Sequence, residues 1–339
     1  MTKAKTIDEY LQFCPTNKTV MENMIKLFHI LSNPKYRASV DNDGILVTVS
    51  MGSDSCVVID LLEKLDLDIK IRYVFFDTGL EYQATKDHIK YIEDKYGIEI
   101  EVLRPKKPIP LAVRDHGQPF LSKRVSEMID RLQKHGFQWE DDTYDNLVKK
   151  YPRCQAALKW WCNEYGENSS FNINRNTYLK EFMIKNPPTF KIASKCCKYA
   201  KKDLLKDCLK NKKHILNVSG VRKSEGGTRA TAYKNCYDGN RTDHDNYRPL
   251  FFYTNKDKDD YAEFNQVEYS LCYKEYGLKR TGCSGCPYGR DYKQELEIIQ
   301  KYEPKLYKAV MNIFGDSYKY TEKYREFQRE QKLLKNPNK

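Results

Sequence analysis

The stretch ILVTVSMGSDSCVVIDLLEKL, residues 45–65, decides the fold of this chain. Its first five residues are apolar or β-branched and predict a buried strand, and the apolar spacing of residues 57–65 predicts a helix. Between the two, SMGSDS combines a glycine with three serines where the chain must turn. Small residues let an anion approach the main chain, and the start of the helix offers N–H groups and a positive dipole end. The turn therefore predicts an anion site, and the alternative is an ordinary turn in which Asp54 or Ser55 caps the helix. It is not a Walker loop, because the lysine of GxxxxGK[ST] is missing.

The alternation of strands and helices continues on both sides of this turn. Residues 69–79, IKIRYVFFDTG, predict a second strand that ends in a turn, and a helix follows through residues 88–96. IEIEVLRP predicts a third strand, and HILNVSGVR at residues 214–222 predicts a further one. This order indicates an α/β fold with an open, mostly parallel sheet, in which ligands bind beyond the carboxyl ends of the strands.

The domain organisation follows from the same pattern. We expect a helical N-terminal extension over residues 1–40 and an α/β domain over residues 41–255, with a helical insertion at about residues 114–195. A C-terminal helical segment over residues 256–339 carries a CxxC motif. No apolar run approaches the length of about 20 residues that a membrane span needs, and the N-terminus has no signal-peptide core. We therefore expect a cytoplasmic protein with no membrane partner.

The chain carries a positive charge surplus. Lys and Arg number 59 against 47 Asp and Glu, for a formal net charge of +12. Such a surplus favours anionic partners, such as nucleotides or nucleic acid. The alternative is a lysine-rich, solvated surface with no dedicated partner.

Four segments resemble motifs of the phosphoadenosine phosphosulfate (PAPS) reductase family, within the PP-loop adenine nucleotide alpha-hydrolase superfamily. SMGSDS is similar to the PP-loop SGGxDS, with Met51 in place of the first glycine. FFDTGLEYQAT at residues 75–85 resembles DTGxxFxET, with Ala84 in place of the glutamate. VSGVRKSEGGTRA at residues 218–230 resembles GxRxxES..R, and YRPLFFYT at residues 247–254 resembles PLxxWT, with Tyr253 in place of tryptophan. The matches occur in the order that the family has.

The resemblance implies a set of nucleotide-binding and catalytic residues. It implies that Asp77 orients a magnesium ion or the nucleotide. Arg222 and Arg229 would pair with phosphate or sulfate oxygens, which guanidinium groups can do in a bidentate manner. For the arginines the alternative is a surface salt bridge with Glu225. The expected cofactor-binding residues are Ser50, Gly52, Ser53, Asp54, Ser55, Asp77, Thr78, Gly79, Arg222 and Glu225, and the expected catalytic residues are Asp54, Arg222 and Arg229.

Four of the eleven cysteines form a paired pattern. Cys196 and Cys197 are adjacent, and Cys283 and Cys286 lie in CSGC. Four thiolates suit a structural zinc ion or a 4Fe-4S cluster, and an unmetallated pair is the third alternative. Adjacent cysteines followed far downstream by CxxC resemble the iron–sulfur branch of the adenylyl-sulfate (APS) and PAPS reductases, which implies a 4Fe-4S cluster. Cys272 is the alternative ligand in place of Cys196 or Cys197.

One feature of the usual sulfonucleotide reductases is missing. Those enzymes attack sulfur with a cysteine in a C-terminal ECGLH segment, and no cysteine follows Cys286 here. We therefore expect an enzyme that binds ATP or a related adenine nucleotide with Mg²⁺ and cleaves it at the α-phosphate. The adenylyl group would activate an acceptor for sulfur transfer from a sulfur donor protein, and nucleic acid is one candidate acceptor. The alternatives are an APS or PAPS reductase that releases sulfite, and a regulatory module that binds nucleotide or nucleic acid without turnover.

Overall fold

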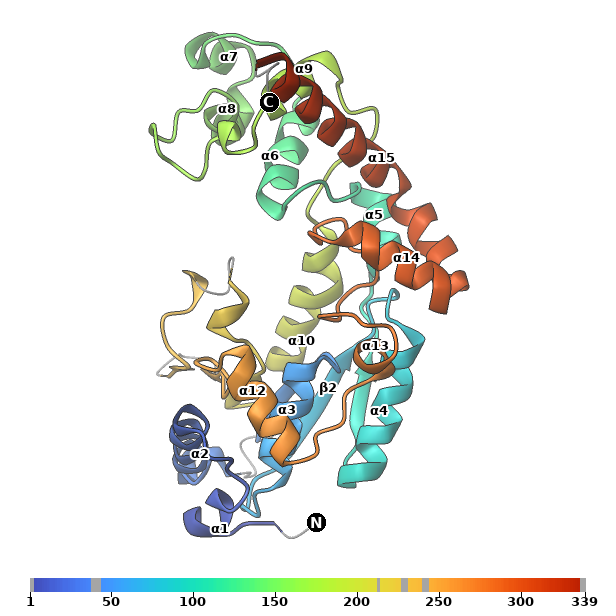
Figure 1. The fold of residues 1–339 in the computed structure, drawn as a ribbon. Coiled ribbons are helices and arrows are strands. Elements are labelled where there is room, and N and C mark those ends of the chain that lie inside the picture. The colour runs from blue at the N-terminus through green and yellow to red at the C-terminus, as the bar shows by residue number, and fades with distance from the viewer. Residues whose placement is uncertain (1–2, 38–43, 212–213, 227–230, 240–243, 336–339) are drawn as a thin grey trace. The chain divides into compact units, whose positions relative to one another are not determined.

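A computed structural model describes residues 3–37, 44–211, 214–226, 231–239 and 244–335 (Figure 1). The chain divides into two compact units: unit 1 comprises residues 1–105 and 201–283, and unit 2 comprises residues 106–200 and 284–339. The predicted helical insertion lies inside unit 2, whereas the boundaries expected near residues 40 and 255 both fall inside unit 1. Among the described helices, none is long and apolar enough to cross a membrane.

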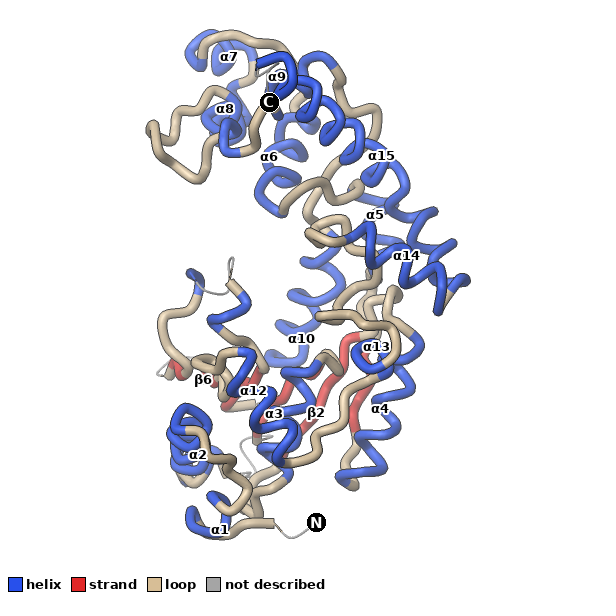
Figure 2. The backbone as a smooth tube through the Cα atoms, in the orientation of Figure 1, coloured by secondary structure: helices blue, strands red, loops and turns tan. Residues whose placement is uncertain are grey.

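The described part of unit 1 contains a six-stranded sheet, which Figure 2 shows in red. All neighbouring strands pair in parallel except the edge strand β5, which is antiparallel to β6. This confirms the predicted α/β fold with a mostly parallel sheet. The strands, in the spatial order β3-β2-β1-β4-β6-β5, are β1 (Ile45–Val49), β2 (Ile71–Phe76), β3 (Ile100–Leu103), β4 (Leu216–Ser219), β5 (Tyr237–Asp238) and β6 (Asp245–Tyr247).

Helices of unit 1 are bounded by capping residues. The Asn17 side chain accepts the main-chain N–H of Val20 at the start of α2, and α4 ends at Gly97, whose φ of 66° is left-handed. Such caps satisfy main-chain groups that the helix leaves open. The helices are α1 (Ile7–Leu11), α2 (Lys18–Leu31), α3 (Ser53–Glu63), α4 (Gln83–Tyr96), α10 (Asp203–Asn211), α12 (Asn255–Phe264) and α13 (Leu271–Lys274), with short turns η1 (Pro34–Tyr36) and η5 (Lys223–Glu225).

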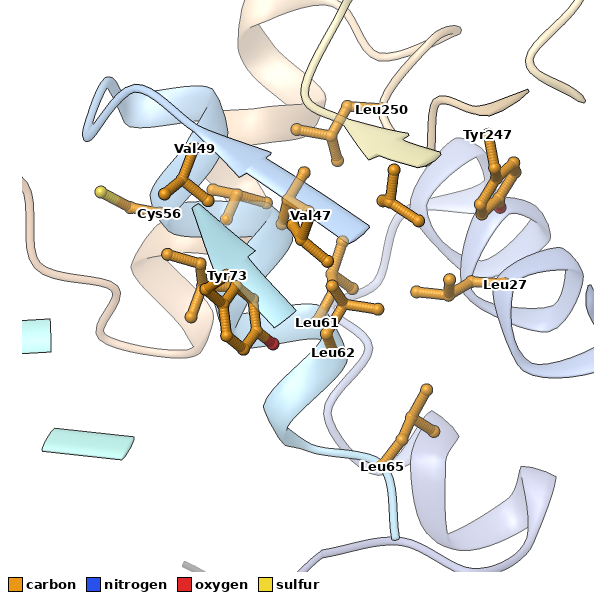
Figure 3. Close-up of a cluster of buried hydrophobic side chains, with 14 of the residues drawn as sticks. Leu27, Val47, Val49, Cys56, Leu61, Leu62, Leu65, Tyr73, Tyr247 and Leu250 are labelled. Atoms are coloured by element: carbon orange, nitrogen blue, oxygen red, sulfur yellow. The ribbon is translucent and has the colours of Figure 1, made fainter. Parts of the chain in front are cut away.

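Both faces of the sheet are buried, as the apolar run in residues 45–49 predicts. Val47 and Val49 point to one face and join a core with Leu61 and Leu62 of α3 (Figure 3). Leu46 points to the other face, where it packs in a cluster with residues of β2 and α10. Alternate residues of a strand point to opposite faces, so this one strand serves two cores. Each fully buried side chain of this size contributes roughly 1.5–3 kcal/mol to stability.

A buried polar network lies within the larger core of unit 1. Asp60 is fully buried and forms an ion pair with Lys64, one helical turn later in the chain. The hydroxyl groups of Tyr96 and Tyr261 donate to the same carboxylate at 2.8 and 2.7 Å. Burial lowers the pKa of Lys64, and Asp60 opposes that shift. Because each member has a partner, the network fastens α3 to α4 and α12.

His88 on α4 gives unit 1 a pH-dependent stability. Its Nε2 lies 3.4 Å from the Sγ of Cys56, and burial, aided by the charges of Lys274 and Lys95, lowers the pKa of His88 to about 4. Between pH 6.5 and pH 4 the unfolded chain binds a proton that the folded chain excludes, so stability falls as pH falls through this window. We expect the free energy of unfolding to decrease by about 2 kcal/mol from pH 7 to pH 5 on account of His88.

The measurement is urea unfolding of the full chain at both pH values. His88→Gln should remove most of this pH dependence, whereas the control His135→Gln, at an exposed position of unit 2, should keep it. An equal pH dependence in the native chain and in His88→Gln would contradict the assignment.

Unit 2 is helical and has its own aromatic core. Phe120, Trp160, Trp161 and Phe182 are fully buried there, and the indole N–H of Trp161 donates to the carbonyl of Glu140 at 2.9 Å. This explains the aromatic character of the predicted insertion. The helices are α5 (Ile109–His116), α6 (Lys123–Lys134), α7 (Tyr144–Lys150), α8 (Gln155–Trp161), α9 (Leu179–Lys185), α14 (Tyr292–Tyr302) and α15 (Pro304–Lys335), with the short turns η2 (Pro152–Cys154) and η3 (Ile173–Arg175).

Candidate functional site

The SMGSDS turn joins the carboxyl end of β1 to the start of α3. Gly52 is the N-cap residue and makes no side-chain cap, so the alternative of an Asp54 or Ser55 cap is wrong. Instead, the Ser55 hydroxyl accepts the main-chain N–H of Ser50 at 3.0 Å and lies 3.0 Å from the Ser50 hydroxyl. These hydrogen bonds between Ser50 and Ser55 join the two ends of the turn. The N-terminus of α3 keeps the positive dipole end that an anion would meet.

Met51 occupies the position of the first glycine in the PP-loop. Its φ is +53°, a left-handed value that favours glycine, and its side chain is fully buried in the core of unit 1. Burial of the apolar side chain offsets the strain of about 1–2 kcal/mol that this conformation costs. The departure from the family pattern therefore keeps the turn geometry that the glycine would give.

Arg222 and Asp54 form a largely buried ion pair beside this turn. The Nε of Arg222 donates to Oδ1 of Asp54 at 2.8 Å, and Nη1 donates to Ser224 and Asn255 at 3.0 and 2.9 Å. Only 6% of Arg222 is exposed, so it is not the surface residue of the alternative reading. Burial raises the pKa of Asp54, and Arg222 opposes that shift. The pair fixes a guanidinium group next to the first turn of α3.

The chain approaches Asp54 closely where β4 ends. A Cβ at Gly220 would lie 3.3 Å from the main chain and the Cβ of Asp54, which is tighter than an ordinary contact. Glycine here lets the segment that carries Arg222 pass directly over the turn. The small residue in SGVR therefore positions the arginine.

Lys258 is a second cation at the turn, and the sequence patterns did not single it out. It lies on α12, and its Nζ donates to the Ser53 hydroxyl at 3.1 Å with only 12% of the side chain exposed. The Tyr273 hydroxyl accepts the main-chain N–H of Ser53 at 3.1 Å and lies 3.1 Å from Thr281 Oγ1. Only the position of Lys258 in the sequence could have indicated its role, because it follows the YRPLFFYT motif by one helical turn.

The DTG turn follows β2, the neighbour of β1 in the sheet. Asp77 is buried, its Oδ1 accepts the main-chain N–H of Gly79 at 3.0 Å, and its Oδ2 accepts from Arg104 at 3.2 Å. The Thr78 hydroxyl donates to Glu81 at 2.6 Å. Burial raises the pKa of Glu81, against the opposing effects of Lys201 and the hydrogen bonds from Thr78. Both predicted turns therefore lie at the carboxyl edge of adjacent strands.

Two other residues, Glu225 and Arg229, were also predicted to belong to the site. Glu225 accepts the main-chain N–H of Arg222 at 3.4 Å, and its charge raises the pKa of Asp54. Glu225 therefore lies beside the Arg222–Asp54 ion pair. Arg229 lies outside the described residues. Its role stays a prediction.

Three of the predicted metal ligands, Cys196, Cys197 and Cys286, belong to unit 2. Burial raises the pKa of Tyr288, and charges on Cys196, Cys197 and Cys286 raise it further. The fourth, Cys283, is the last residue of unit 1, where the Thr78 hydroxyl donates to its Sγ at 3.6 Å.

The alternative ligand Cys272 has a different setting in unit 1. It is fully buried, and its Sγ lies 3.6 Å from the Thr85 hydroxyl of α4. Thr85 is the threonine that stands at the end of the DTGxxFxET-like segment.

The CSGC loop is held to the C-terminal helices of unit 2 through Gly285. Its N–H donates to Glu295 at 3.1 Å, and its carbonyl accepts from the Tyr318 hydroxyl. Its φ is +62°, and a Cβ would stand 2.4 Å from a methyl group of Val310. Only glycine suits this position, so packing against Val310 fixes the backbone of the loop at Gly285.

The donor chemistry of these cysteines fits a thiolate-bound iron–sulfur cluster. Thiolates are the ligands that such clusters use, and three of the four cysteines belong to unit 2. In the part of the chain that the structure describes, no group of three His, Cys, Asp or Glu side chains is arranged to hold a metal ion. The four-cysteine ligand set therefore stays a prediction.

This mostly parallel sheet, with a turn of small residues between its central strand β1 and α3, defines an α/β class of protein. The phosphoadenosine phosphosulfate reductase domain matches residues 44–161 and 133–288. These segments cover more than half of the chain, which therefore belongs to the PAPS reductase family.

The chain also resembles individual proteins over parts of their length. An uncharacterized protein of Methanocaldococcus jannaschii, MJ0066, is 32% identical over 143 residues, which are 40% of this chain and 27% of that protein. Adenosine 5'-phosphosulfate reductase 1 of Bacillus subtilis is 32% identical over 86 residues, or 25% of this chain and 36% of that enzyme. The chain thus spans well under half the length of these two relatives. Among solved structures, a PAPS reductase from Candida auris in a phosphate complex aligns with a TM-score of 0.40 and 12% identity, over 84% of this chain and 98% of that one.

Proposed function

We propose that this protein is an enzyme that binds ATP or a related adenine nucleotide at the SMGSDS turn and cleaves it between the α- and β-phosphates. The observation that carries the proposal is the pair of largely buried cations, Arg222 and Lys258, beside the N-terminus of α3. Desolvated cations and helix N-terminal amides are suited to phosphate oxygens. Membership of the PAPS reductase family supports an adenine nucleotide as the ligand.

The proposed reaction transfers the adenylyl group. An oxygen of the acceptor attacks the α-phosphorus, the bond from that phosphorus to the bridging oxygen breaks, and pyrophosphate leaves with Mg²⁺. The acceptor loses its proton to solvent. Sulfur at the oxidation level of sulfide, supplied by a donor protein, would then displace AMP. Lys258 and the first-turn amides of α3 would hold the phosphates, and Arg222, fixed by Asp54, would stabilise charge that develops at the α-phosphate.

We also propose that Cys196, Cys197, Cys283 and Cys286 ligate a 4Fe-4S cluster. Such a cluster supplies a redox-active or structural iron–sulfur centre. The support is the donor set of four cysteine thiols and the resemblance of their spacing to the iron–sulfur branch of the APS and PAPS reductases.

The test is turnover of radiolabelled ATP by protein purified without oxygen, with and without DNA, tRNA and sulfate. Pyrophosphate is the expected product, formed faster with one acceptor and matched by an equal amount of adenylyl group on that acceptor, because no sulfur donor is present to displace AMP. Bound ATP with no pyrophosphate under all conditions would favour the alternative of a regulatory nucleotide-binding module.

A second candidate function is APS or PAPS reduction. It is favoured by the 32% identity with the Bacillus subtilis APS reductase. Steady sulfite production from adenylyl sulfate with thioredoxin would establish this candidate and overturn the adenylyl-transfer proposal. Binding of adenylyl sulfate without sulfite release is the expected result.

Replacement of Lys258 by methionine should weaken ATP binding. Methionine keeps most of the apolar stem but removes the ammonium group that reaches Ser53, so we expect Kd for ATP to rise about tenfold, as loss of one charge-assisted hydrogen bond predicts. Isothermal titration measures this change. Lys256→Met on the same helix, where the side chain is 80% exposed, is the matched control. Equal ATP affinity in the two variants would show that Lys258 does not contribute to ATP binding.

A further inference from the structure

The positive charge of this protein is concentrated in one unit. Unit 2 contains 29 Lys and Arg against 18 Asp and Glu, whereas unit 1 contains 30 against 29. Nearly all of the net charge of +12 therefore belongs to the helical unit. A solvated lysine-rich surface would distribute the surplus over both units, so the asymmetry indicates that unit 2 meets an anionic partner.

Within unit 2, lysines gather around a pair of stacked rings. His116 at the end of α5 and Tyr199 lie 4.7 Å apart between ring centroids, with 15° between the ring planes. The ammonium groups of Lys198 and Lys107 lie 4.4 and 5.4 Å from the centroid of Tyr199. Both rings are partly exposed. Two ammonium groups, those of Lys107 and Lys198, therefore lie beside the stacked pair of rings.

The charge around His116 comes from several elements. Burial lowers the pKa of His116, and Lys107, Lys195 and Lys134 lower it further. The ring is therefore neutral near pH 7 and stacks without adding charge. Asp115 opposes the shift and pairs with Lys107 at 3.0 Å.

The carboxylates of this region leave a positive balance. Asp115 also accepts from Arg114 at 3.1 Å, and Asp130 pairs with Lys134 and Lys195 at 3.0 and 3.7 Å. In these ion pairs two carboxylates are thus shared among four cations, which are Lys107, Arg114, Lys134 and Lys195.

We propose that this basic ring cluster, defined as Lys107, His116, Lys195, Lys198 and Tyr199, binds single-stranded nucleic acid. Its lysines would contact the phosphodiester backbone, and the Tyr199–His116 pair would stack with a base. Combined lysines and stacked aromatic rings are the features of sites that bind single strands with little sequence preference. The inference rests on the proposed function, which it deepens by naming the acceptor as a nucleic acid, and Cys196 and Cys197 lie within the same segment of sequence.

Fluorescence anisotropy of the full chain with labelled 20-nucleotide DNA and RNA single strands tests the proposal. We expect Lys107→Glu with Lys198→Glu to weaken binding at least tenfold and to flatten the salt dependence, because backbone contacts release counterions. Tyr199→Ala should weaken binding at least fivefold, through loss of stacking. Circular dichroism shows whether each variant retains its helical content.

The matched control is the double charge reversal Lys18→Glu with Lys86→Glu at exposed positions of unit 1, which should change affinity less than twofold. Equal losses in the two double variants would overturn the assignment to this cluster. Tighter binding to duplex than to single strands, or equal competition by polyglutamate of the same charge, would overturn single-stranded nucleic acid as the ligand. The assay needs no ATP turnover, so its failure is distinguishable from failure of the adenylyl-transfer proposal.

Discussion

Arg222→Ala is expected to lower the rate of ATP cleavage at least a hundredfold, while Kd for ATP changes less than tenfold. The guanidinium group lies beside the first turn of α3 and is oriented by Asp54 at 2.8 Å. A fixed donor aimed at charge that develops during reaction contributes about 2.7–4 kcal/mol to the transition state, which corresponds to a hundredfold or more in rate. Such an interaction affects kcat more than binding of the ground state.

Single-turnover kinetics and direct ATP titration together measure this split. Because alanine leaves Asp54 buried without this partner, loss of folding must be separated from loss of catalysis. Arg222→Lys keeps a charge and should recover part of kcat. Arg72→Ala removes another largely buried, ion-paired arginine, which pairs with Glu101, and should leave turnover unchanged. A parallel fall in binding and turnover in Arg222→Ala, with the fold intact, would contradict a role in the transition state.

The sequence predicted the central sheet well, because its strands carry strong local signals. β1 and β2 are apolar runs bounded by turn residues, and both were placed within a few residues of their observed limits. β5 and β6 were not predicted, since they contain only two and three residues and are largely polar. In β6, Asp245 is buried and accepts from Lys35 and Tyr36 at 2.6 Å, contacts that only the folded chain creates.

The candidate site was predicted where it is contiguous in sequence and missed where it is assembled from distant segments. The SMGSDS turn is local, so its position followed from six residues. Lys258 reaches Ser53 across 205 positions, and Tyr273 reaches the same residue across 220. No local pattern encodes such contacts. The partner of Asp54 was not predicted either, because its ion pair with Arg222 depends on the parallel pairing of β1 with β4.

The ion pair also changes the interpretation of Asp54. A carboxylate that is predicted to be catalytic would be expected to face the ligand, yet Oδ1 of Asp54 accepts the Nε of Arg222. We therefore expect Asp54 to act by positioning the arginine. The pH dependence of kcat should then change little in Asp54→Asn, whereas a general base would lose one limb of its pH profile.

The iron–sulfur proposal has the largest expected effect on the composition of the protein. Protein purified without oxygen should be brown and contain iron and sulfide in equal amounts, because four cysteine thiolates would hold the cluster. Cys286→Ser should abolish the absorbance and the bound iron. Cys236→Ser, at a buried cysteine outside the predicted set, should preserve both and serves as the matched control.

The adjacent pair provides the finer test of the ligand set. If Cys196 and Cys197 are both ligands, serine at either position should lower iron content severalfold, and Cys272→Ser should not. Cys272 lies against Thr85 in unit 1, whereas Cys196, Cys197 and Cys286 belong to unit 2. If Cys272→Ser loses iron while Cys196→Ser or Cys197→Ser keeps it, Cys272 is the ligand in place of that cysteine. One equivalent of zinc without acid-labile sulfide in the native protein would instead establish the zinc alternative, because zinc is held by thiolates without inorganic sulfide.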